Sequence, residues 1–147
     1  MNVKFGSRFL VVGLASVALG WASPRPLHAE ETLDKPAARK GQTVFKRYCV
    51  ACHGRSGKGD GSLAKDLRSS VPDITQLTKK NKGVFPFERI AKLVDGRETA
   101  RAHGSPDMPA WGDAFQKTSG TDAETVDQAI RQLTHFIWSL QRPPSQK

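Results

Sequence analysis

Cysteine is scarce in this chain: its 147 residues contain only two, Cys49 and Cys52, which are three positions apart. So low a number excludes a disulfide-rich scaffold and a zinc site built from four thiolates. His103 and His135 do not form the second compact cluster that a mixed zinc site needs. A thiol oxidoreductase would place the pair beside a βαβ unit, and no segment shows the two-residue alternation of a strand.

Long apolar runs are almost absent as well. The one candidate, residues 9–22, is shorter than the roughly 20 residues that a membrane-spanning helix needs. Lys4 and Arg8 precede this run, and small residues follow it. A basic start followed by a short apolar run predicts a secretory signal peptide over residues 1–29.

Two cleavage points fit the predicted signal peptide. Cleavage after Ala29 is favoured because two acidic residues begin the next segment there, although Leu27 fits the small-residue rule poorly. Cleavage after Ala22 and an uncleaved N-terminal anchor are the alternatives. The favoured point leaves one mature domain, residues 30–147, which we expect in the periplasm without a stable membrane span.

Acidic residues are in the minority, with 14 against 23 basic ones, for a net charge of +9. Removal of residues 1–29 takes away three basic residues and no acidic one, so the net charge falls from +9 to +6. A basic chain is a candidate for nucleic-acid binding, but an exported one does not meet nucleic acid, and we exclude that class. The 37% hydrophobic and 25% charged residues indicate a globular domain.

Three segments show helical periodicity and none shows that of a strand, so the sequence predicts an all-α fold. The first helix extends from about Pro36 to Cys49, and proline suits its first turn. Its predicted inner face contains Gly41, Val44, Phe45 and Tyr48. Glycine inside a helix costs up to about 1 kcal/mol relative to alanine. Gly41 therefore indicates close approach by another backbone, with a tolerated imperfection as the alternative.

The last helix extends from about Asp122 to Gln141. Thr121 is its predicted N-cap, and Glu124 three residues later completes a capping box. A middle helix extends from about Pro86 to Val94, with Gly96 to close its end. The last helix carries an apolar stripe, formed by Val126, Ile130, Leu133, Ile137 and Leu140.

His53 follows Cys52 directly, which completes the motif C-x-x-C-H. This motif attaches haem in c-type cytochromes. Thiols three residues apart at a helical end lie on one side and reach two vinyl groups of one porphyrin. The sequence thus predicts one covalently bound haem c, with Cys49 and Cys52 as anchors and His53 as an axial ligand of the iron. A local disulfide beside an incidental histidine is the alternative.

Methionine is equally scarce, and Met108 is the only one beyond the predicted signal peptide. Pro109 disfavours helical geometry at Met108, and Pro106 stiffens the loop from the other side. We expect the Met108 thioether to be the second axial ligand, which raises the reduction potential relative to two imidazoles. Core packing of Met108 and ligation by His103 are alternatives. His135 is expected at the edge of the last helix, partly buried or exposed.

These residues together resemble those of the class I c-type cytochromes. The resemblance covers about residues 34–141, with CVACH after the first helix, MPAW in a late loop and aromatic residues in the final helix. It implies loops wrapped around one haem and first and last helices that cross near right angles at Gly41, Phe45, Leu133 and Phe136. It also implies that the Pro72 carbonyl accepts a hydrogen bond from the haem histidine. The longer string CHGRSGKGDG resembles bacterial members that serve oxidases and periplasmic dehydrogenases.

Two other features near the motif receive weaker interpretations. Gly57–Gly61 lacks the preceding strand and the G-K-[ST] ending of a phosphate loop. We expect its small residues to let the loop run close to the haem edge. Trp111 either packs in the core or donates its N–H to a haem propionate.

The predicted function is that of a periplasmic one-electron carrier of a respiratory chain, with no catalytic residues, rather than an enzyme. The expected partners are redox proteins: an oxidase, a dehydrogenase or a cytochrome complex. The alternatives are a haem subunit of a larger oxidoreductase complex, and a haem enzyme or gas sensor in which Met108 is displaced. Basic residues either steer an acidic partner or form an ordinary solvated surface: Lys46, Arg47, Arg55, Lys58, Lys79, Lys80 and Lys82.

Overall fold

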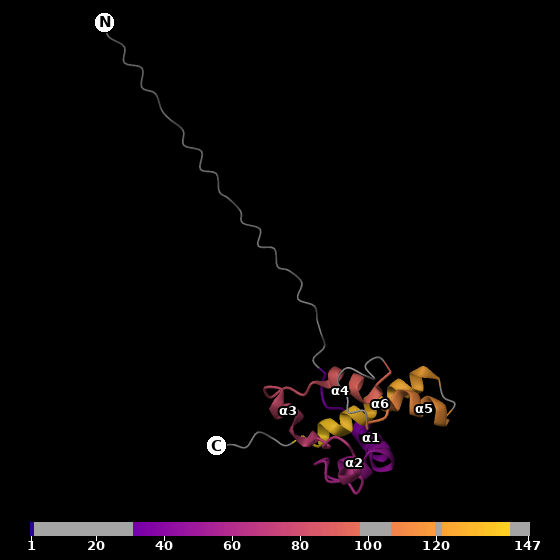
Figure 1. The fold of residues 1–147 in the computed structure, drawn as a ribbon. Coiled ribbons are helices and arrows are strands. Elements are labelled where there is room, and N and C mark those ends of the chain that lie inside the picture. The colour runs from indigo at the N-terminus through magenta and orange to yellow at the C-terminus, as the bar shows by residue number, and fades with distance from the viewer. Residues whose placement is uncertain (2–30, 98–106, 120–121, 142–147) are drawn as a thin grey trace. The chain divides into compact units, whose positions relative to one another are not determined.

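The computed structural model describes residues 31–97, 107–119 and 122–141, together with Met1 (Figure 1). The predicted signal peptide and its cleavage points lie outside the described residues. No strand occurs within the described ranges, and the predicted all-α fold is confirmed. The elements are α1 Lys35–Tyr48, α2 Val50–His53, η1 Ala64–Asp66, η2 Ile74–Gln76, α3 Leu77–Lys80, α4 Phe87–Asp95, α5 Trp111–Ser119 and α6 Ala123–Ser139.

The first helix, α1, begins where the sequence predicts it. Asp34 is the N-cap, and its carboxylate accepts a hydrogen bond from the Ala37 N–H at 3.0 Å. Pro36 lies in the first turn, where its missing N–H leaves no partner unsatisfied. Phe45 and Gly41 are buried, as the predicted inner face requires. The helix ends at Tyr48, one residue before the predicted end.

The last helix, α6, starts one residue later than its predicted cap implies. Asp122 is the N-cap, and its carboxylate accepts a hydrogen bond from the Thr125 N–H at 2.8 Å. The prediction of Thr121 as the N-cap was therefore wrong, and Thr121 itself lies outside the described residues. The apolar stripe of the helix is buried as predicted through Val126, Ile130, Leu133 and Ile137.

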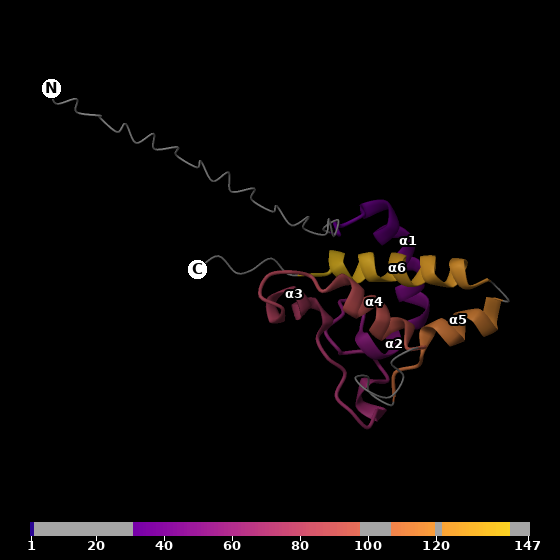
Figure 2. The same cartoon turned by 90° about the horizontal axis from the view of Figure 1, so that it is seen from above.

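The two long helices pack against each other more extensively than any other pair, and α1 crosses α6 at a steep angle (Figure 2). At the crossing, a Cβ atom on Gly41 would lie only 1.9 Å from the Gln132 carbonyl oxygen. The Phe45 and Phe136 rings are 5.1 Å apart, and Leu133 is fully buried. The close backbone approach predicted from Gly41 is thus confirmed, and so are the residues that make the crossing.

Two shorter helices complete the packing around α6. The middle helix, α4, was predicted, and Gly96 ends it with a left-handed φ of 70°. Helix α5 was not predicted, because Trp111 and Phe115 are its only large apolar residues. Both rings pack against Tyr48 of α1, at centroid distances of 5.5 and 5.2 Å. Among the described residues, no helix has the length and apolar character to cross a membrane.

Candidate functional site

The two cysteines and His53 lie on one tight helical turn. Cys49 is the C-cap of α1, and its N–H donates to the Phe45 carbonyl at 2.9 Å. The chain then enters α2, where the N–H groups of Cys52 and His53 both donate to the Cys49 carbonyl, at 3.2 and 2.9 Å. Gly54 ends α2 with a φ of 74°. This geometry places three reactive side chains within five residues, and the two thiols are not joined in a disulfide.

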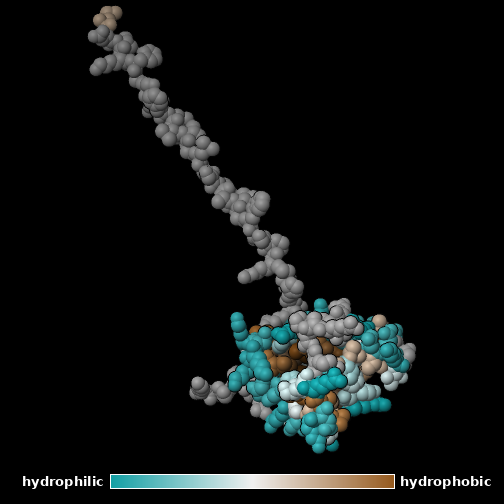
Figure 3. All heavy atoms as spheres, in the orientation of Figure 1, coloured by the Kyte–Doolittle hydropathy of each residue, from teal (hydrophilic) through white to brown (hydrophobic). Residues whose placement is uncertain are grey.

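The side chains of this turn line a mainly apolar cavity. The cavity has about 1110 Å³ of atom-free space, including its open mouth. Its walls are α1 and α2, the segment 67–74, α4, the segment 107–111 and α6. Apolar residues are visible among hydrophilic ones on the face seen in Figure 3.

All four predicted site residues line this one cavity: Cys49, Cys52, His53 and Met108. Met108 lies between α4 and α5, 55 positions after His53, so only folding brings their side chains to a common space. Met108 is partly buried and packs against the core. His103, the alternative ligand, lies outside the described residues.

Burial controls the protonation of the side chains on the turn. It raises the pKa of the Cys49 thiol to about 12, and the neighbouring Cys52 adds to the effect. Burial lowers the pKa of His53, so its imidazole is neutral at physiological pH and keeps a lone pair for a metal. The Pro72 carbonyl opposes that shift in pKa, which places Pro72 near His53 as the resemblance implied.

One buried atom of the site is left without a partner. The Nδ1 atom of His53 has no hydrogen-bond partner of ordinary geometry, although the Pro72 carbonyl is close enough to influence its pKa. Buried polar atoms are rarely left in this state. The orphaned nitrogen, the apolar walls and the paired thiols fit a large flat cofactor that carries a metal. A haem c has these properties, with His53 and Met108 available as nitrogen and sulfur ligands.

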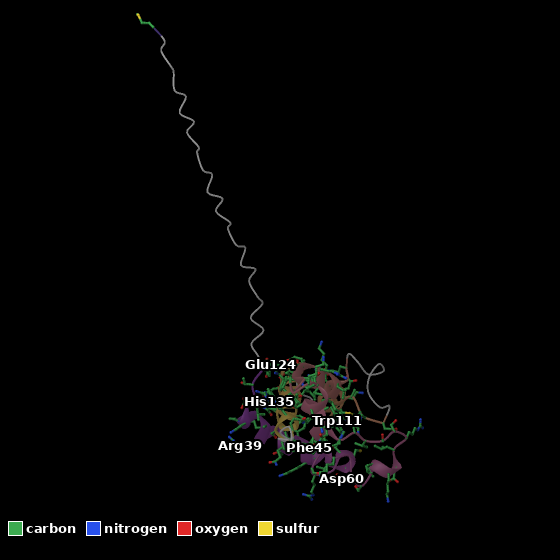
Figure 4. The ribbon with its side chains drawn as sticks, turned by 90° about the vertical axis from the view of Figure 1, so that its left-hand side faces the viewer. Arg39, Phe45, Asp60, Trp111, Glu124 and His135 are labelled. Atoms are coloured by element: carbon green, nitrogen blue, oxygen red, sulfur yellow. The ribbon has the colours of Figure 1, made fainter. Side chains whose placement is uncertain are left out.

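Aromatic residues form one wall of the cavity. Tyr48 and Trp111 both line it, and Phe115 packs against both rings from behind. Phe45 lines the cavity beside the helix crossing, and Figure 4 labels Phe45 and Trp111 toward the middle of the domain. Trp111 is partly buried and packs against the core, and a contact of its N–H with a haem propionate stays a prediction.

The glycines after the motif bring two backbone segments together. Gly57–Gly61 do not line the cavity. Gly57 and Gly59 have φ values of 73° and 82°, which side chains rarely adopt, and a Cβ on Gly59 would lie 2.2 Å from the Val71 carbonyl oxygen. The glycines therefore let the turn approach the backbone of the segment 67–74, which then forms a wall of the cavity.

Sequence reasoning missed most of that wall. The residues 69–72 carry no recognisable motif, and only Pro72 was named, through the resemblance. Asp107 was also missed, although its carboxylate accepts a hydrogen bond from the Ser69 N–H at 3.1 Å. The only sequence signal for this contact is an acidic residue directly before Met108. That signal does not reveal that its partner is Ser69, 38 residues earlier in the chain.

His135 does not line the cavity and was predicted wrongly as partly buried or exposed. It is buried, with 6% of its surface accessible, and packs against the Phe87 ring at 4.6 Å. Its Nδ1 accepts a hydrogen bond from the Asp34 N–H at 3.3 Å, and its Nε2 lies 3.5 Å from a Glu31 carboxylate oxygen. The segment before α1 therefore closes over His135, which α6 alone would leave at an edge.

We expect His135 to make the protein less stable in mild acid. Burial lowers its pKa, with Arg131 acting in the same direction and Glu31 and Asp34 opposing. The unfolded chain therefore takes up the proton first, and stability falls as the pH drops below about 6.5, until the folded imidazole is protonated as well. Chemical unfolding of the holoprotein between pH 8 and 5 measures this loss.

The control for this prediction is His135→Asn, which keeps an acceptor for the Asp34 N–H but does not titrate. The difference between the two pH profiles isolates His135, because every other titrating group is common to both proteins. We expect a flatter profile for the variant. Parallel profiles would show that His135 titrates equally in the folded and unfolded states.

Comparison with known proteins agrees with this geometry. The chain matches the Cytochrome c family over residues 38–141, well over half of its length. It is 27% identical over 138 residues to the Cbb3-type cytochrome c oxidase subunit FixP of Azorhizobium caulinodans. That match covers 94% of this chain but only 38% of the relative, so the chain spans less than half of the relative's length. No solved structure shows significant similarity to the chain.

The family match includes the cysteine pair, His53 and every cavity wall. The donor set fits the cofactor of that family, because two thiols and a neutral imidazole meet in an apolar cavity. The chain therefore belongs to the cytochrome c family and carries a covalently bound haem c that transfers electrons.

Proposed function

We propose that the protein is a periplasmic one-electron carrier whose haem is anchored by Cys49 and Cys52 and ligated by His53 and Met108. The observation that carries this proposal is that all four side chains line one apolar cavity. In the proposed division of the chain, residues 1–29 direct export and residues 30–147 form the mono-haem domain.

Each of the four residues has a distinct role in this proposal. When bound, haem c supplies the one-electron chemistry of its iron. Cys49 and Cys52 hold the porphyrin through thioether bonds, so the cofactor cannot dissociate. His53 offers a nitrogen lone pair because burial keeps its imidazole neutral. The soft thioether of Met108 favours the reduced iron and raises the potential.

The cavity walls add to the same effect. They exclude water because they are mainly apolar, and Phe45, Leu133 and Ile137 come from the most deeply buried part of the core. Burial and low polarity are among the factors that set the potential of a haem. If His53 and Met108 both served as ligands, the iron would have no position for a substrate, and we therefore propose electron transfer without a catalytic step.

Replacement of Met108 by alanine tests the axial assignment. We expect the purified ferric variant to lose the weak long-wavelength absorption band of a thioether-bound haem. Its reduction potential should fall by about 0.08 V, which is one tenth of the 0.8 V range that axial ligands span. The ferrous variant should bind carbon monoxide rapidly, while the native protein binds it slowly.

The native protein serves as its own control in this experiment. An unchanged band in Met108→Ala would refute ligation by Met108 and direct attention to His103. Rapid carbon monoxide binding by the untreated native protein would favour a haem enzyme or gas sensor, because it would show that Met108 is easily displaced.

A second candidate function is a haem subunit of a larger oxidoreductase. The relative in Azorhizobium caulinodans is named as an oxidase subunit, which favours this candidate. Exposed basic residues, among them Lys46, Arg47 and Lys58, are compatible with either a transient acidic partner or a fixed one. Purification from native membranes tests the subunit, which would stay with its complex. For a transient carrier we expect a rate of electron exchange that falls as the ionic strength rises.

A further inference from the structure

A hydrogen bond joins two walls of the haem cavity. The Ser69 N–H donates to the Oδ2 atom of Asp107 at 3.1 Å, between segments that are 38 residues apart in sequence. Ser69 and Asp107 both line the cavity and both are half-buried. An ionised carboxylate accepts a stronger hydrogen bond than a neutral group does, and partial burial reduces competition from water.

The segment that carries Ser69 is itself held against the haem-attachment turn. The Ile74 N–H donates to the Gly57 carbonyl at 2.9 Å, and Gly59 is in close backbone contact with Val71. Pro72 belongs to the same segment, and its carbonyl influences the pKa of His53. The segment 69–74 is therefore tied by backbone contacts to the turn that carries His53, and a group attached to the segment is held near that turn.

Met108 follows Asp107 directly. Pro109, the next residue, restricts the backbone of Met108 to extended geometry. The hydrogen bond of Asp107 holds the backbone on one side of Met108, and Pro109 restricts it on the other. The next helix, α5, begins at Trp111, three residues after Met108, so Met108 is not held by the hydrogen bonds of that helix.

We propose that Asp107 is a positioning residue, whose hydrogen bond to Ser69 holds the Met108 loop against the segment 69–74, which is tied to the haem-attachment turn. This inference rests on the proposed ligation by Met108. In this proposal the Asp107 carboxylate is not a ligand of the iron. It acts by reducing the freedom of the Met108 loop, so the thioether spends more of its time bound to the metal.

The test compares Asp107→Ala with Asp107→Asn in purified holoprotein. The alanine variant loses the acceptor, and we expect a weaker long-wavelength band and about tenfold faster carbon monoxide binding to the ferrous protein, as the loss of a hydrogen bond to a charged group implies. The asparagine variant keeps an acceptor oxygen and should stay close to the native protein. Asp66→Ala removes an exposed carboxylate elsewhere and serves as the control for charge.

Ser69→Pro removes the donor instead of the acceptor and should reproduce the effect of Asp107→Ala. If Asp107→Ala does not accumulate as holoprotein, the same measurements on Ser69→Pro decide. Native band intensity and carbon monoxide rate in both variants would overturn the proposal, as would equal effects from Asp66→Ala. Met108→Ala is measured in parallel to separate the two proposals. A long-wavelength band that survives in Met108→Ala refutes ligation by Met108. A band that is lost in Met108→Ala but unchanged in Asp107→Ala and Ser69→Pro refutes the role of Asp107.

Discussion

Replacement of both Cys49 and Cys52 by alanine is expected to yield a polypeptide that carries no haem and does not fold stably. The haem cavity lies between α1, α4 and α6, and its walls include core residues such as Phe45 and Leu133. An empty apolar space of this size leaves the surrounding side chains without contacts. A chain of this length buries only about two-thirds of its unfolded surface, so little other burial compensates.

Mass spectrometry and circular dichroism of the exported product measure both parts of this prediction. We expect the mass of the bare polypeptide and little of the helical signal of the native protein. The single variant Cys52→Ala is the matched comparison, because it keeps one thioether bond and should retain haem and an intermediate stability. A double variant that folds as well as the native protein would show that the helices do not need the cofactor.

Replacement of Gly41 by alanine is expected to destabilise the holoprotein by about 3 kcal/mol, the upper end of the usual cost of overpacking. The added Cβ would lie 1.9 Å from the Gln132 carbonyl oxygen and 2.8 Å from the Leu133 nitrogen. Both atoms belong to the backbone of α6, which has no rotamer that relieves the clash. The two helices must therefore separate, and this loosens the packing of Phe45 on Phe136.

Urea unfolding of the holoprotein measures this effect as a lower midpoint with an unchanged slope. Gln42→Ala is the matched control, since Gln42 is the adjacent, exposed position of α1 and should change stability by no more than about 0.5 kcal/mol. In an open helix, glycine to alanine stabilises by up to about 1 kcal/mol. A gain in stability for Gly41→Ala would therefore contradict the close crossing of α1 and α6.

The elements that could be predicted from the sequence are those with strong local signals. Helix α1 has a proline in its first turn and a regular apolar face, and α4 ends at a glycine in the left-handed region. Helix α5 has no comparable pattern. Trp111 and Phe115 are stabilised by contact with Tyr48, more than 60 residues earlier in the chain, and no local pattern reveals that partner.

The cap of α6 shows the limit of local signals at the level of one residue. Thr121 and Asp122 are both good N-cap residues, and a capping box favoured the first. The structure selects Asp122, whose carboxylate reaches the Thr125 N–H. Which of two adjacent residues caps a helix depends on the direction from which the chain arrives, and composition does not specify this direction.

His135 shows the same limit for burial. The sequence places it next to the apolar stripe of α6, where a polar residue is normally exposed. The contact of its Nδ1 with the Asp34 N–H and the nearby Glu31 carboxylate bury it instead. These partners are about 100 residues away along the chain, so the burial of His135 is a tertiary effect.

The sequence by itself was enough to predict the family and the covalent haem c, and to propose the residues that hold it. A C-x-x-C-H motif that uses both thiols predicts a haem c, because covalent attachment depends on residue type and short spacing, and one methionine beside a proline suggests the second ligand. Tertiary structure alone decided how these groups are held: the wall at residues 69–74, the hydrogen bond from Ser69 to Asp107 and the cover over His135. Each of these joins residues far apart in the chain, and such contacts form only when the whole domain packs.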